Sequence, residues 1–344
     1  MLNLVTAFVL IFFIVMIFGA LTAGSEIKDP SGRVLLVNPE GTVVDQEEFN
    51  SGFLSNIGTG PSTDQIQTRD LIRLIRAAAE DKDIPAVFVD FSSTSFAGTT
   101  TAINIAKELK ALRDSGKRVI AFHDRLTTSS YLMASQASEV WVHPVGSISV
   151  KGIGGVRAYQ KELYENLKIN FHNYSQGDFK SALEPNTRTG MSENDRMQRE
   201  ALLNPIWDEM KSLMAEGRGI DSDDIQYFAD EYSGFFSEAA IGNIAYAIEN
   251  KIIDGTKSFP EFRQYMIEEF GIDEEAETET YKTISYKEYA GQIDEGFSHS
   301  DNQIAVITAE GAIMEGDISR GCLLYTSDAA DEGLGVDLGG RRII

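Results

Sequence analysis

Short apolar runs alternate with amphipathic stripes along residues 30–190. The runs have the length of buried strands and are bounded by turn residues; they are Arg33–Asn38, Ala86–Phe91, Arg118–Phe122, Glu139–His143 and the strand-like Ile169–Tyr174. The stripes repeat at helical spacing and predict helices; these are Thr68–Glu80, Ile103–Leu112 and Ser129–Ala137. Strands that alternate with helices in this order predict an α/β domain with a mostly parallel sheet and right-handed crossovers.

A helical region is predicted to follow at residues 191–271. Its helices are expected at Ser192–Gly217, with an interruption at Pro205, and at Phe236–Asn250 and Phe259–Phe270. The next stretch, 272–301, opens with the run IDEEAETET and is predicted to be a solvated acidic linker.

The N-terminal segment is long and apolar enough to cross a bilayer. No charged side chain occurs in residues 2–24, and about 20 apolar residues suffice to span the hydrocarbon core as a helix. The alternative is a cleaved signal peptide, whose apolar core usually has about 7–15 residues behind a basic start. Because this run is longer and no Lys or Arg precedes it, an uncleaved single transmembrane anchor is predicted.

A short internal repeat suggests that a second domain begins near the end of the chain. Val34–Asp45 reads VLLVNPEGTVVD, and Ile304–Glu315 reads IAVITAEGAIME. Residues 30–271 are therefore interpreted as an N-terminal half, and residues 302–321 as the first strands of a truncated C-terminal half. Residues 322–344 have no apolar period and resemble a translated sequencing adapter, so this artefact is excluded from fold reasoning.

Composition excludes several classes of function. The chain has 344 residues with 30 Lys+Arg against 53 Asp+Glu, a net charge of −23. That acidity argues against a nucleic-acid partner, which requires basic patches. One cysteine, Cys322, rules out a disulfide framework. The four histidines show no metal-binding spacing, so no histidine metal site is expected.

Lys180 is the candidate for catalytic chemistry. It follows the strand-like run Ile169–Tyr174 in the segment QGDFKSALEP, beside Phe179, Ala182 and Leu183. A lone lysine after a strand is usually a surface residue. Burial among those apolar neighbours would disfavour its charged form, so that the neutral amine could take a proton from a serine hydroxyl.

Several motifs together resemble the long form of signal peptide peptidase A, also called protease IV. They are RVLLVNPEG, SYLMASQASEVWVHPVGSISVKGIGG, FKSALEP and NQIAVITAEGAIMEG, and with the anchor they cover about residues 1–321. The resemblance implies a crotonase-like (ClpP-like) parallel β/α domain with an added helical region. It also implies a Ser–Lys peptidase in which the lysine of FKSALEP, here Lys180, is the general base and which uses no metal or organic cofactor.

The same resemblance implies that the nucleophile lies outside this chain. In the long form, the first of two homologous halves supplies the base and the second supplies the serine. Thr128 occupies the serine-equivalent place, so Thr128, Ser129 and Ser130 are interpreted as relics or helix-start hydroxyls. Phe91–Gly98 also lacks the Gly-Gly turn that would present oxyanion-binding amides.

Three glycines follow the strand predicted at Glu139–His143. Gly152, Gly154 and Gly155 either allow a close backbone approach or are ordinary turn glycines.

The resulting hypothesis is a membrane-anchored serine endopeptidase that degrades cleaved signal peptides and other membrane-proximal peptides. It is expected to bind membrane lipid through residues 2–24, to form a homo-oligomer, and to sit in the inner (cytoplasmic) membrane with its soluble domain on the extracytoplasmic side. The fragment itself, lacking the serine, is expected to be inactive. The alternatives are a non-catalytic scaffold half of an oligomer and a crotonase-type acyl-CoA enzyme.

Overall fold

The computed structural model describes residues 28–47, 64–237, 242–293, 312–314 and 322–324, together with Phe12 and Phe13. The chain divides into two units, Met1–Asp45 with Thr63–Ile293, and Gln46–Ser62 with Asp294–Ile344. We call the first the sheet unit. In the second unit, β10 (Ala312–Met314) pairs in parallel with β11 (Cys322–Leu324).

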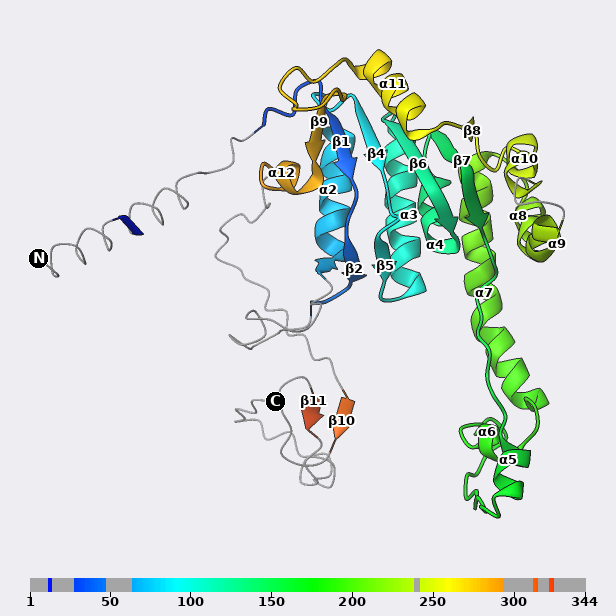
Figure 1. The fold of residues 1–344 in the computed structure, drawn as a ribbon. Coiled ribbons are helices and arrows are strands. Elements are labelled where there is room, and N and C mark those ends of the chain that lie inside the picture. Colours follow the sequence, from blue (N-terminus) through cyan, green and yellow to red (C-terminus); the bar gives the residue numbers. More distant parts are fainter. Residues whose placement is uncertain are drawn as a thin grey trace, which may run out of the picture. The chain divides into compact units, whose positions relative to one another are not determined.

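A six-stranded sheet forms the centre of the sheet unit (Figure 1). Its strand order is β8-β7-β6-β4-β1-β9, and every neighbouring pair is parallel. The strands are β1 (Val34–Val37), β4 (Ala86–Val89), β6 (Arg118–Thr127), β7 (Glu139–Ser149), β8 (Gly255–Thr256) and β9 (Thr283–Ser285). The predicted α/β fold with a parallel sheet is confirmed.

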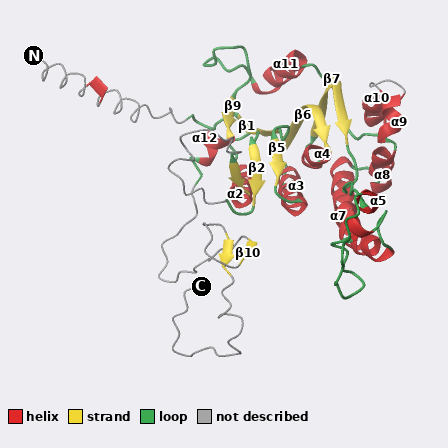
Figure 2. Cartoon of the chain, turned by 60° about the horizontal axis from the view of Figure 1, so that its bottom comes forward, coloured by secondary structure: helices red, strands yellow, loops and turns green. Residues whose placement is uncertain are grey.

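Helices cover both faces of this sheet because its strands are apolar on both sides. Figure 2 shows α2 (Thr68–Glu80), α3 (Thr99–Asp114) and α4 (Thr128–Ala134) on one side of the strands and α11 (Phe259–Phe270) on the other. Successive residues of a strand point to opposite faces. Accordingly Val119 and Ala121 join the larger core, whereas Phe122 stacks on Phe262 of α11 with ring centroids 4.4 Å apart.

A second, smaller sheet has the order β3-β2-β5, again with parallel neighbours. It consists of β3 (Gln65–Gln67), β2 (Gly41–Val44) and β5 (Thr94–Phe96). Gly41 has a φ of 122°, and a Cβ there would lie 2.0 Å from the Asp64 carbonyl oxygen. Only glycine fits this close approach of two strands.

The acidic segment predicted as a linker belongs to the sheet unit up to Ile293. Within it, β9 pairs with β1, and α12 (Tyr286–Ala290) follows directly. Ile284 is fully buried, and Asp273 forms a 2.8 Å ion pair with Arg33. The linker prediction is wrong for residues 272–293, because spaced apolar side chains among the acids anchor the segment.

The helical region is present, with one change. It contains α8 (Ser222–Asp230), α9 (Tyr232–Ser237), α10 (Gly242–Glu249) and the long α7 (Glu193–Arg218). Pro205 lies inside α7 without ending it. The predicted interruption at Pro205 is wrong. Proline has no backbone N–H to donate, but α7 continues on both sides of it.

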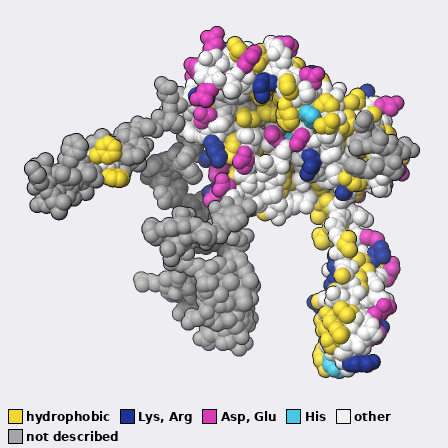
Figure 3. All heavy atoms as spheres, viewed as in Figure 1, with side chains coloured by type: hydrophobic (Ala, Val, Ile, Leu, Met, Phe, Trp, Pro, Cys, Tyr) yellow, Lys and Arg dark blue, Asp and Glu magenta, His cyan; other side chains and the backbone are white. Residues whose placement is uncertain are grey.

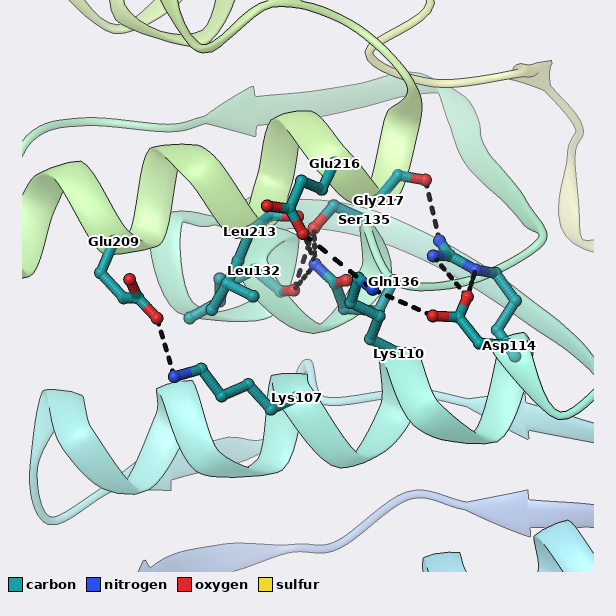
Figure 4. A network of polar contacts seen from close by, with 11 residues as sticks. Lys107, Lys110, Asp114, Leu132, Ser135, Gln136, Glu209, Leu213, Glu216 and Gly217 are labelled. Atoms are coloured by element: carbon teal, nitrogen blue, oxygen red, sulfur yellow. Dashed lines mark hydrogen bonds and ion pairs between the residues drawn. The ribbon is translucent and has the colours of Figure 1, made fainter.

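The C-terminal half of α7 is docked on α3 and α4 (Figure 4). The fully buried Gln136 donates from Nε2 to the Leu213 carbonyl oxygen at 2.9 Å. Arg113 donates to the Gly217 carbonyl oxygen at 2.9 Å, and Lys107 pairs with Glu209 at 2.7 Å. At Gly217 the backbone of α7 touches the backbone at the end of α4, since a Cβ on Gly217 would lie 2.3 Å from the Ser135 carbonyl oxygen.

The N-terminal half of α7 extends away from the sheet (Figure 1). We call residues 156–205 the arm; it also contains α5 (Lys161–Asn166) and α6 (Glu184–Thr187). Asp195 is the only buried residue of the arm. Many large apolar side chains of the arm are instead exposed; they are Val156, Leu163, Leu167, Ile169, Phe171, Tyr174, Phe179, Met197 and Leu202.

The predicted anchor at residues 2–24 lies outside the described residues, apart from Phe12 and Phe13. Among the helices that the structure describes, none combines the length and the hydropathy that a bilayer crossing requires.

His123 of β6 is a buried histidine in an unusual setting. Its Nδ1 lies 2.9 Å from Ser92 Oγ, which donates to Asp90 Oδ1 at 2.6 Å. Its Nε2 is buried and has no hydrogen-bond partner within the described part of the chain. Burial lowers the pKa of His123, and this effect outweighs the opposing charges of Asp90 and Asp124. The imidazole is therefore neutral in the folded protein at neutral pH.

Substituting Gly217 by alanine should weaken the docking of α7. The added methyl group meets backbone atoms of Ser135, which cannot rotate away. We expect the free energy of unfolding to fall by about 1–3 kcal/mol, although alanine in a helix otherwise gains about 1 kcal/mol over glycine. Denaturant titration measures the change. Gly190→Ala is the control, because a Cβ there meets open space; equal stability of Gly217→Ala and the unmodified chain would contradict the close contact.

Acid should destabilise the sheet unit through His123. Because its folded pKa lies below the ordinary value of about 6.5, the unfolded chain binds a proton first as the pH falls. The free energy of unfolding should therefore decrease below pH ~6.5, by up to about 1.4 kcal/mol per pH unit. Denaturant titrations between pH 5 and 7 should show a smaller decrease in His123→Gln. His172→Gln, which removes an exposed imidazole, is the control; an equal loss of pH dependence in both variants would contradict the assignment.

Candidate active site

Thr128 lies at the carboxyl end of β6, where α4 begins. In open parallel sheets this edge is the usual place for binding and catalysis. Thr127 is the N-cap of α4 and forms a capping box with Ser130. Thr128 Oγ1 donates to the Lys151 carbonyl oxygen and accepts from the Lys151 N–H, both at 2.9 Å. The interpretation as a helix-start hydroxyl is confirmed for Ser130, which pairs with Thr127 in the capping box. The Thr128 hydroxyl is engaged by the Lys151 backbone.

A cavity of about 140 Å³ opens beside Thr128. It lies where α3 and α4 begin and where the chain leaves β7, and Met210 of α7 contributes to its wall. Its lining residues are Phe96, Gly98, Thr99, Ala102, Thr128, Ser129, Gly152, Ile153 and Met210. None of these side chains is ionisable, so the cavity holds hydroxyl groups but no general base.

The glycines of this edge have ordinary surroundings. A Cβ built on Gly152, Gly154 or Gly155 would meet no atom within 4 Å. Of the two readings of these residues, the structure of this chain favours turn glycines over a close backbone approach. The segment Phe91–Gly98 contains β5 and the hydrogen bond between Ser92 and His123, and its sequence has no Gly-Gly turn.

Lys180 lies in the arm, in the stretch between α5 and α6. It is exposed, and residues 169–174 before it form no strand. The strand prediction and the expected burial of Lys180 are therefore wrong for this chain. Phe179 and Ala182 beside the lysine are exposed as well, and Leu183 is half-buried.

A second cavity, of about 600 Å³, is lined by Lys180. Its other lining residues are Arg157, His172, Asn173, Tyr174, Ser175, Phe179, Ser181, Ala182, Leu183 and Arg199. Two serines share this cavity with Lys180. Ser181 donates its hydroxyl to Asp195 at 2.8 Å, and no hydrogen bond joins Lys180 Nζ to either serine among the described contacts.

Asp195 anchors the Lys180 segment to the first turn of α7. Besides Ser181, its carboxylate accepts from Arg157 at 3.3 Å and from Arg199 at 3.1 Å. Burial opposes ionisation of this carboxyl group, but the hydrogen bonds of Ser181 and Arg199 and the charges of both arginines lower its pKa. Asp195 is therefore ionised and fixes the backbone next to Lys180.

Sequence reasoning identified Lys180 but missed Asp195, Arg157 and Arg199. Asp195 reads in the sequence only as an acid in the first turn of a helix, where acids are common. Its role requires contacts with residues 14 and 38 positions away, which no local pattern indicates.

The structure does not bring the hydroxyl site and the lysine together. Thr128 and Ser129 line one cavity and Lys180 lines the other. Within the described residues there is also no group of three His, Cys, Asp or Glu side chains that could hold a metal ion.

Comparison with known proteins shows which proteins this chain is similar to. Residues 111–269, from α3 to α11, match the model of peptidase family S49. The chain is 28% identical over 304 residues to Protease 4 of Salmonella typhi and 25% identical over 292 residues to Protease 4 of Haemophilus influenzae. These matches cover 87% and 83% of this chain but 48% and 47% of the relatives. The chain thus spans about half the length of the curated relatives it matches.

Solved structures give a looser likeness. A mutant of the 1510-N membrane-bound stomatin-specific protease is 12% identical with a TM-score of 0.35, over 69% of this chain and 85% of that one. The family model and the curated relatives show what the chain resembles: residues 111–269 are similar to peptidase family S49, and the chain is similar over most of its length to proteins named Protease 4 and serine protease SPPA.

Proposed function

We propose that this chain is the base-supplying half of a serine peptidase that acts through a Ser–Lys dyad. The observation that carries the proposal is the setting of Lys180. Its amine lines an open cavity, while the neighbouring Ser181 is fixed to the buried Asp195. A general base needs this combination of a held backbone and access for a second group.

The proposed nucleophile is a serine of a second homologous half, outside this chain. At the serine-equivalent place here, the Thr128 hydroxyl both donates to and accepts from the Lys151 backbone. Its cavity also lacks an ionisable side chain. A serine presented at Lys180 would lose its proton to the lysine as it attacks a peptide carbonyl, and the lysine would then protonate the leaving amine.

The proposed substrates are cleaved signal peptides and other peptides at the membrane, and the proposed fold family is crotonase-like. Residues 2–24 would anchor the protein in the inner membrane with its soluble part on the extracytoplasmic side. The many exposed apolar side chains of the arm support a homo-oligomeric assembly, because large exposed apolar patches mark interaction sites. In that assembly the arm would be covered and Lys180 desolvated.

Removing the Lys180 amine should abolish catalysis with little change in stability. In a longer form of the protein that carries a second homologous half, Lys180→Ala should lower kcat for peptide or ester hydrolysis by at least about 100-fold. Because Lys180 is exposed, the melting temperature should change by a few degrees at most. Lys161→Ala, at an arm lysine outside the cavity, should keep full activity. Unchanged activity of Lys180→Ala would show that another group is the base.

Deleting residues 2–24 should release the protein from membranes. The deleted run contains no charged side chain, and a helix of this length supplies the hydrophobic energy of a bilayer span. Fractionation of cells that express each form should move the protein from the membrane pellet to the soluble fraction. Persistent membrane association after a carbonate or high-salt wash would point to a different anchor.

A further inference from the structure

The cavity around Lys180 carries an excess of positive charge in an acidic protein. Arg157, Lys180 and Arg199 all line it, while the net charge of the chain is −23. The carboxylate that contacts this group, Asp195, already accepts from Ser181 and from both arginines. The Asp195 carboxylate offsets one of these three positive charges, which leaves an excess of two among the four groups.

Arg199 offers a binding group that the arm does not use. It contacts Asp195 through Nε at 3.1 Å, and its two terminal nitrogens make no hydrogen bond within the described part of the chain. The guanidinium plane is thus fixed at one edge and open at the other, where its planar fork matches the two oxygens of a carboxylate. Lys180 has no ion-pair partner among the described residues and adds a second donor.

Aromatic and apolar side chains form a large part of the remaining wall of the cavity. His172, Tyr174, Phe179 and Leu183 lie around the cations, and Tyr174 and Phe179 are 86% and 52% exposed. Figure 3 shows hydrophobic side chains, a histidine and basic side chains next to one another at the far end of the arm. A volume of about 600 Å³ lies in the range of small-ligand sites, roughly 300–1,000 Å³.

From this combination we infer that the cavity binds a carboxylate of a peptide, with Arg199 as the principal partner and the aromatic wall holding the apolar side chain beside it. The carboxylate belongs either to the C-terminus of the peptide or to an acidic side chain. A peptide fits better than a lipid headgroup, because Asn173 and Ser175 also line the cavity and bring polar groups that can pair with a peptide backbone. The inference rests on the proposed function and specifies which peptides reach Lys180.

Binding of labelled peptides to the chain in detergent micelles tests this without hydrolysis. Three probes share one apolar hexapeptide sequence: a free C-terminal acid, its C-terminal amide, and an amide with one internal glutamate. We expect the free acid, the glutamate peptide or both to bind at least about tenfold more tightly than the plain amide, since a charge-assisted bidentate contact is lost with the carboxylate. The preference should shrink with added salt. Which acid binds identifies the source of the carboxylate.

Variants of two neighbouring arginines give the matched comparison. Arg199→Gln should remove the tenfold preference, and Arg199→Lys, which keeps the charge but not the fork, should remove most of it. Arg196→Gln should leave the preference intact, because Arg196 lies outside the cavity and pairs weakly with Glu200 at 4.0 Å. Circular dichroism and limited proteolysis check that the arm remains folded; if Arg199→Gln loosens it, Arg199→Lys carries the comparison.

Equal affinity for the acids and the amide would overturn the inference. So would binding to phosphatidylglycerol vesicles that Arg199→Gln abolishes while no peptide binds, since the site would then recognise membrane phosphate. The proposed function fails separately. Lys180-dependent hydrolysis without any carboxylate preference would support the Ser–Lys dyad and overturn the carboxylate inference. A carboxylate preference together with full activity of Lys180→Ala would support the carboxylate inference and overturn the dyad.

Discussion

The docking of α7 on α3 and α4 is the contact on which the rest of the candidate site depends. Gln136, fully buried, donates to the Leu213 carbonyl oxygen, and Gly217 allows the helix backbone to touch Ser135. A buried amide that has a fixed partner specifies position more strictly than apolar contact does, because losing that partner costs its desolvation. The direction of α7, and with it the place of the arm, is set there.

The arm follows a different physical rule from the sheet. Its only buried residue is the carboxylate of Asp195, held by Ser181, Arg157 and Arg199. A buried charge is tolerated only with such partners, so the arm replaces a hydrophobic core with a small charged cluster. The cost is that its large apolar side chains remain in solvent. Because these apolar side chains are exposed, the proposed function includes a second layer of protein that covers the arm.

Sequence patterns were reliable where periodicity and burial agree. Thr68–Glu80 and Phe259–Phe270 are helices with the predicted bounds, because each has an apolar stripe that the sheet covers. Sequence patterns gave wrong predictions where contacts with residues distant in the sequence determine the structure. Residues 169–174 look strand-like but have no strand to pair with, and the acidic segment after Ile272 is held by Ile284 and the Asp273–Arg33 pair. The motif FKSALEP predicts a role for Lys180, whereas the contacts of Asp195 join distant residues and no motif indicates them.

The two cavities divide the requirements of acyl transfer between them. The cavity at the sheet edge has hydroxyl groups and two helix starts but no ionisable side chain, so nothing there can take a proton from an attacking group. The cavity in the arm has an amine and cations, but its Ser181 hydroxyl is committed to Asp195. Since a base acts only on a hydroxyl within hydrogen-bond reach, neither cavity suffices alone. A nucleophile brought to the arm by another segment would complete the cavity around Lys180. The cations that line this cavity would then orient the peptide for attack.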